Sequence, residues 1–187
     1  MRNILLILFA GFLLLSACSD TKNAWLSIDE LYKNAIADAI IADSSEIYNN
    51  LIDINFSNTY LTWKNINGKE HLLVTTLSTH QNSYKVNDST VTFWGETWVT
   101  VAPEMKDFFK NYKYISDSLL QLNVLQLLGM PASNSKYIIA EFWVDVDSLF
   151  RPCPDNEITD KKADLYLPAN VNSDYHKWYK DNILRSY

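Results

Sequence analysis

Apolar and polar positions follow two different periods along this chain, and together they predict both strands and helices. Residues 60–66 and 69–78 are β-prone runs separated by Asn67-Gly68. This dipeptide is the strongest short signal for a β-hairpin, because both turn positions need a positive φ. Residues 90–101 and 137–146 are rich in β-branched and aromatic residues. They predict two further strands, the second of them central in the sheet.

Four other segments carry signals for helices. Ser27-Ile28-Asp29-Glu30 reads as a capping box, and apolar residues at helical spacing follow it to about Ala42. Pro103 suits the first turn of a helix running to about Tyr112. Ser116 is expected to cap a leucine-rich helix that ends at Gly129, and Ser173 is expected to cap a last helix with an aromatic stripe. The expected fold is a single α+β domain over residues 26–187, in which about four helices pack a mainly antiparallel sheet with a β-hairpin at 60–78.

The amino-terminal apolar run predicts export rather than a membrane span. It covers 12 residues, from Ile4 to Leu15, after one basic residue, Arg2. A helix needs about 20 residues to cross ~30 Å of hydrocarbon. The run leads into Leu15-Ser16-Ala17-Cys18, which resembles the lipobox of bacterial lipoproteins. The resemblance implies a signal peptide over residues 1–17, lipidation such as palmitate on Cys18, and a lipidated cysteine with a short tether over residues 18–25.

The same resemblance implies a location in the bacterial cell envelope, with the membrane as partner through the lipid on Cys18. In enteric bacteria an aspartate directly after the lipidated cysteine favours retention at the inner membrane. Ser19 occupies that place here, so the resemblance favours the outer membrane.

Composition excludes several classes of function. The formal net charge is −6, and no Lys/Arg run exists beyond Lys161-Lys162. Binding to phosphates needs clustered positive charge, so a nucleic-acid partner is not expected. The four glycines form no phosphate-binding loop, and the common nucleotide motifs are absent. No cofactor is implied.

A short repeat supplies a candidate catalytic pair. Residues 96–101 and 141–146 are identical at four of six positions, with Glu96 and Trp98 matching Glu141 and Trp143. Alternation in a strand would place both carboxylates on the face opposite the core. Two carboxylates flanking a cleft can perform glycosidic chemistry. The commoner explanation is that Glu beside Trp decorates a half-covered sheet face.

Cys153 is a second candidate. Lipidation of Cys18 would leave it as a lone thiol, which makes an internal disulfide impossible. Arg151 could lower its pKa, and His80 is the default base because it lies in a predicted loop. A buried inert thiol is the alternative.

Asp155, Glu157 and Asp160 form an acidic stretch that could bind calcium. Their spacing lacks the features of an EF-hand, and solvated charge is the alternative. The histidines and cysteines have no zinc spacing.

Aromatic residues make up 13% of the chain, which suits either core packing or a glycan-binding groove. Residues 98–104 and 150–160 resemble segments of an uncharacterised bacterial protein family, which implies no catalytic residues. The function expected from the sequence is binding or interaction at the envelope, with a protein or glycan partner. The alternative is an envelope hydrolase, either glycosidase-like with Glu96 and Glu141 or thiol-dependent with Cys153.

Overall fold

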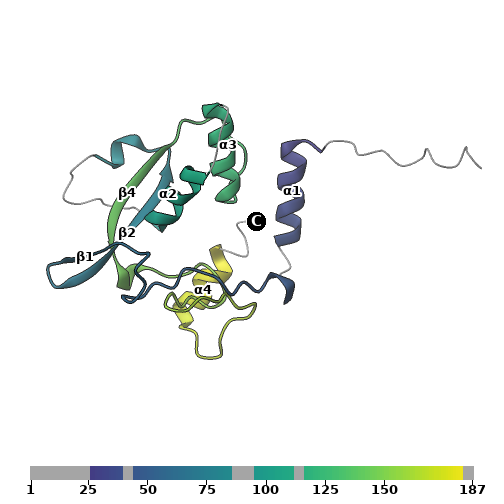
Figure 1. The fold of residues 1–187 in the computed structure, drawn as a ribbon. Coiled ribbons are helices and arrows are strands. Elements are labelled where there is room, and N and C mark those ends of the chain that lie inside the picture. Colours follow the sequence, from purple (N-terminus) through teal and green to yellow (C-terminus); the bar gives the residue numbers. More distant parts are fainter. Residues whose placement is uncertain (1–25, 40–43, 86–94, 112–115, 183–187) are drawn as a thin grey trace, which may run out of the picture.

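The computed structural model describes residues 26–39, 44–85, 95–111 and 116–182, which fold into a single α+β domain (Figure 1). In these residues, four helices accompany an open antiparallel sheet. The strands are β1 (Trp63–Ile66), β2 (Lys69–Ser78), β3 (Thr100–Val101) and β4 (Ile138–Asp145), and the helices are α1 (Ile28–Ala39), α2 (Ala102–Asn111), α3 (Asp117–Leu127) and α4 (Ser173–Asn182). The predicted fold class is confirmed.

The predicted signal peptide, Cys18 and the tether up to residue 25 lie outside the described residues. In the part that is described, no helix has both the length and the apolar character that a membrane crossing requires.

The central strand of the sheet is β2. β4 pairs with one edge of β2 along its whole length, from His71↔Asp145 to Ser78↔Ile138. β1 and β3 share the other edge of β2. Within the described part of the sheet β4 pairs only with β2, so β2 and not the strand predicted over 137–146 is central there. Phe142 and Val144 of β4 pack on the core face of the sheet through their pairing with β2.

The predicted hairpin between β1 and β2 is confirmed. Asn67 and Gly68 have φ angles of 55° and 84°, as the tight turn between the two strands requires. The side chain of Asn65 also accepts a hydrogen bond from the Gly68 amide at 3.0 Å.

The strand predicted over 90–101 is much shorter in the described part of the segment, which begins at residue 95. Only Thr100 and Val101 pair with β2. Before them, the Thr76 hydroxyl donates a hydrogen bond to the Trp98 carbonyl oxygen at 2.9 Å. The Thr76 side chain therefore pairs with a backbone carbonyl that a longer strand would have bonded to the backbone of β2. Residues 95–99 form an irregular segment.

Local signals located the helix starts to within one residue. Ser27 and Glu30 exchange the reciprocal hydrogen bonds of a capping box at α1, and Ser116 accepts from the Leu119 amide at α3. The predicted Ser173 cap is wrong by one position. The side chain of Asn172 accepts from the Asp174 and Tyr175 amides, and Ser173 is the first residue of α4.

The core lies on one face of the sheet. Leu72 and Val74 of β2 are almost completely buried there, together with Leu61 and Val101. Partly buried residues extend this core, among them Val99, Phe142, Val144 and Leu149. On the opposite face, α2 packs against β2 and β3 and buries Ala102 and Met105 (Figure 1).

The apolar stripes of α1 and α3 are only partly covered. Figure 1 shows α1 standing apart from the sheet, and its Ile28 and Leu31 are about half exposed. On α3, Val124 and Leu125 are buried, whereas Leu127 is exposed.

Candidate functional site

A pocket of about 460 Å³ opens on the core side of the sheet. Its floor consists of Phe142 and Val144 of β4, together with Leu149 and Val99. Residues 95–98 form one wall, and the other wall consists of Ser148, Phe150 and Pro152 together with Trp178 of α4. Segments far apart in the sequence therefore enclose a single, mostly apolar site.

Strand alternation explains the floor. Phe142 and Val144 lie two residues apart in β4, so they share a face, and their partners Val74 and Leu72 in β2 share it with them. Two of the residues that complete the core therefore also face the pocket. The long antiparallel pairing of β4 with β2 holds these two residues of the floor in place.

Aromatic contacts fix the wall that α4 provides. The rings of Phe150 and Trp178 are 4.8 Å apart with their planes at 82°, and Tyr175 stacks on Trp178 at 5.6 Å. Such edge-to-face and offset pairs are favourable arrangements of aromatic rings. The Tyr175 hydroxyl lies 2.7 Å from the carbonyl oxygens of Arg151 and Cys153, to which it donates. These contacts attach α4 to the segment that follows β4.

Arg151 organises that segment. Its side chain is only 13% exposed and donates to the Asp160 carboxylate at 2.7 Å. It also donates to the carbonyl oxygens of residues 52, 158, 160 and 162. Buried guanidinium groups need such partners, because an unpaired buried charge is very costly. Arg151 therefore connects residues 150–162 to residue 52, next to the core.

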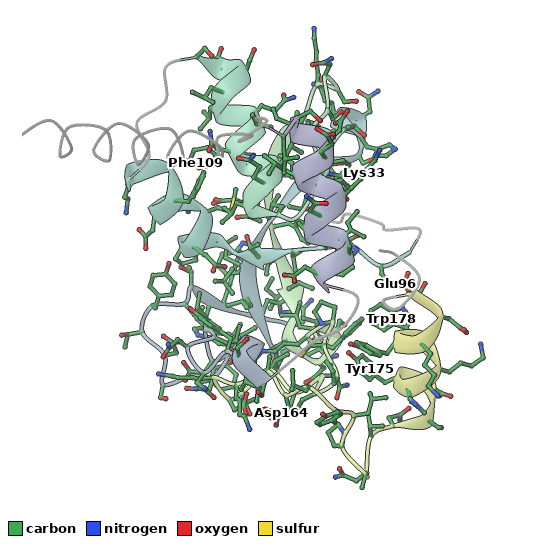
Figure 2. The ribbon with its side chains drawn as sticks, turned by 90° about the vertical axis from the view of Figure 1, so that its right-hand side faces the viewer. Lys33, Glu96, Phe109, Asp164, Tyr175 and Trp178 are labelled. Carbon is green, nitrogen blue, oxygen red and sulfur yellow. The ribbon has the colours of Figure 1, made fainter. Side chains whose placement is uncertain are left out.

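Glu96 is the single charged residue among the described residues that line the pocket. Its Oε1 atom accepts a hydrogen bond from Nε1 of Trp178 at 3.0 Å. Figure 2 shows Glu96 lying next to the end of α4 that carries Trp178. The contact joins the two walls and places a carboxylate at the edge of an aromatic pocket.

The structure does not bring Glu96 and Glu141 together. Glu141 alternates with Phe142 and therefore points to the opposite face of β4, where it forms an ion pair with Lys106 of α2 at 3.0 Å. The matching tryptophans are also separated, since Trp143 shares the Glu141 face and Trp98 is 62% exposed at the pocket wall. The short repeat is thus a sequence similarity between two segments with different structures.

Cys153 is partly buried and lies behind the pocket wall. Its thiol donates to the Asp155 carbonyl oxygen at 2.7 Å. Burial raises the pKa of Cys153 to about 11, and the opposing effect of Arg151 is smaller. Arg151 thus lowers the pKa of the thiol, as considered from the sequence, but burial outweighs this effect.

His80 is not in a position to assist Cys153. It follows the carboxyl end of β2, beside the start of β4, because the two strands are antiparallel. The segment that carries Cys153 leaves the opposite end of β4. The arrangement gives no support to a thiol-dependent hydrolase.

The three acidic residues considered for calcium organise the loop locally. Asp155 accepts from the Glu157 amide, Glu157 accepts from the amides of Thr159 and Asp160, and Asp160 pairs with Arg151. Within the described residues, no group of three or more His, Cys, Asp or Glu side chains is arranged to hold a metal ion.

Sequence reasoning found Glu96 but missed its partners in the pocket. Trp178 belongs to the aromatic stripe predicted for the last helix, and Phe142 alternates with Glu141 and so faces the core. No local pattern connected them with Glu96, which is 82 residues from Trp178. The high aromatic content, with its alternative of a binding groove, was the one available signal.

Comparisons with protein-family models, curated proteins and solved structures find no match for this chain.

Proposed function

We propose that this protein is a lipid-anchored protein of the bacterial cell envelope whose domain acts by binding a small ligand in the aromatic pocket. The anchor is the lipid on Cys18, and the outer membrane is the proposed location. The observation that carries the binding role is the pocket of about 460 Å³ with mostly apolar walls. Ligand sites of proteins are typically concave, mainly apolar and supplied with few polar groups.

Binding is favoured over hydrolysis because the described residues of the lining include Glu96 but no second carboxylate. Hydrolysis of a glycosidic bond by the usual route needs two carboxyl groups across one cleft. In the part of the lining that the structure describes, Glu96 is the only acidic residue, and Glu141 lies on the other face of β4. A single carboxylate beside four aromatic rings is instead suited to recognition.

The binding role is tested with N-phenyl-1-naphthylamine, a neutral apolar dye whose fluorescence increases in an apolar site. The full-length Cys18→Ser protein should bind it with saturation. Ser148 lines the pocket, so Ser148→Trp should fill the site and abolish the increase. Ser135→Trp introduces the same side chain at an exposed position outside the lining and should leave binding intact. Equal binding by both variants would contradict the assignment.

The anchor is tested separately by Cys18→Ser in the producing bacterium. The wild-type protein should partition with membranes, and the variant should be released from them while remaining folded. Continued retention of a folded Cys18→Ser protein would contradict lipid anchoring.

A further inference from the structure

The described side chains that line the pocket carry negative charge and no positive charge. Among the described residues that line the pocket, Glu96 is the only one with an acidic or basic side chain. The basic residues directly next to lining residues in the sequence are Arg151 and Lys177. The guanidinium group of Arg151 is already occupied by the Asp160 carboxylate and by backbone carbonyls, and Lys177 forms an ion pair with Asp181. Lys106 lies on the opposite face of the sheet with Glu141. No other described residue of the lining therefore neutralises the charge of Glu96.

The aromatic side chains of the lining also favour a positively charged ligand. The faces of aromatic rings carry the negative part of a quadrupole and attract cations, with tryptophan the strongest. Trp98, Phe142, Phe150 and Trp178 all line the pocket, and the near-perpendicular rings of Phe150 and Trp178 orient two faces differently. Aromatic groups around one carboxylate are a recurrent way of binding alkylammonium groups.

We infer that the pocket binds an organic cation, with an ammonium group beside Glu96 and the aromatic faces, and with an apolar body against Val144 and Leu149. This inference rests on the proposed binding function and names its ligand class. An anionic ligand would meet the Glu96 carboxylate as a like charge. A glycan would need hydrogen-bond partners for many hydroxyl groups, and the lining offers the polar side chains of Glu96, Thr97 and Ser148.

The test compares benzyltrimethylammonium with neopentylbenzene, which has the same shape and a neutral carbon in place of the nitrogen. Calorimetric titration of the full-length Cys18→Ser protein should give at least about fivefold tighter binding of the cation. Glu96→Gln keeps an oxygen that can accept from Trp178 and removes the charge. It should weaken binding of the cation about threefold to fivefold and leave the neutral compound unchanged.

Glu141→Gln is the matched control, because it changes the net charge equally on the opposite face of the sheet. It should leave both affinities unchanged. Equal or tighter binding of neopentylbenzene, no binding of the cation, or equal effects of Glu96→Gln and Glu141→Gln would overturn the inference. Binding of N-phenyl-1-naphthylamine shows whether only the cation inference has failed or the proposed binding function as well. If N-phenyl-1-naphthylamine still binds in a manner sensitive to Ser148→Trp, the pocket is a binding site for another class of ligand.

Discussion

Nε1 of Trp178 donates a hydrogen bond to Oε1 of Glu96 at 3.0 Å, across 82 residues of sequence. The contact joins the irregular segment before β3 to the last helix at the edge of the pocket. Because the carboxylate is charged and partly solvated, we expect a modest coupling free energy of about 0.5–1 kcal/mol between the two side chains. A double-mutant cycle of Glu96→Ala and Trp178→Phe, measured by urea unfolding, should give this value. Fully additive effects would show that the contact adds no stability.

Arg151→Lys should destabilise the domain by about 2–3 kcal/mol, because an ammonium group cannot replace the several hydrogen bonds of the guanidinium group. Those bonds connect residues 150–162 to residue 52, so their loss should also reduce dye binding in the pocket. The control is Lys177→Ala, which removes an exposed ion pair with Asp181 and should not change unfolding measurably. Similar unfolding curves for both variants would contradict the central role of Arg151.

Cys153 should be unreactive in the folded protein. Its pKa is raised to about 11 by burial, so little thiolate exists at pH 8. In the Cys18→Ser protein, in which Cys153 is the single thiol, alkylation by iodoacetamide should be roughly 100-fold slower in the folded state than in urea. Rapid labelling of the native protein at pH 8 would show that the thiol is accessible and activated.

The same raised pKa makes stability depend on pH. Above about pH 9 the unfolded chain releases the Cys153 proton while the folded protein retains it, so the unfolding free energy should fall from there to about pH 11. Burial also raises the pKa of Tyr175, which acts in the same direction. Urea unfolding at several pH values should therefore show a smaller decline for Cys153→Ala than for its parent. An identical slope would contradict the assignment to Cys153.

Gly68→Ala should destabilise the β1–β2 hairpin by about 1 kcal/mol. The cost comes from the positive φ of 84°, since an added Cβ would meet no atom within 4 Å. Gly95→Ala has open space as well but no positive φ, so thermal unfolding should show little change or a slight gain. Equal destabilisation by both substitutions would contradict a backbone origin of the effect.

Short-range signals account for the parts of the fold that were predicted well. The hairpin depends on two adjacent residues, Asn67 and Gly68, and the start of α1 depends on Ser27 and Glu30, which lie three residues apart. The prediction of a long strand before α2 was wrong because the hydroxyl group of Thr76, on another strand, donates a hydrogen bond to the Trp98 carbonyl oxygen. No periodicity within residues 90–101 contains that information.

The candidate site was predicted less completely for the same reason. Alternation placed Glu141 and Phe142 on opposite faces of β4, as the structure confirms. The assumption that Glu96 also belonged to a regular strand then grouped it with Glu141. The actual partner of Glu96, Trp178, arrives through the attachment of α4 by Tyr175 to residues 151 and 153. This tertiary contact leaves no periodic trace in the sequence.

The most direct test of the central claim is the position of N-phenyl-1-naphthylamine in the bound state, measured by intermolecular nuclear Overhauser effects in the full-length Cys18→Ser protein. We expect contacts from the dye to the indole protons of Trp178 and to the side chains of Phe142 and Val144. Contacts confined to the exposed stripe of α1, around Ile28 and Leu31, would place the dye outside the pocket and contradict the proposed binding site.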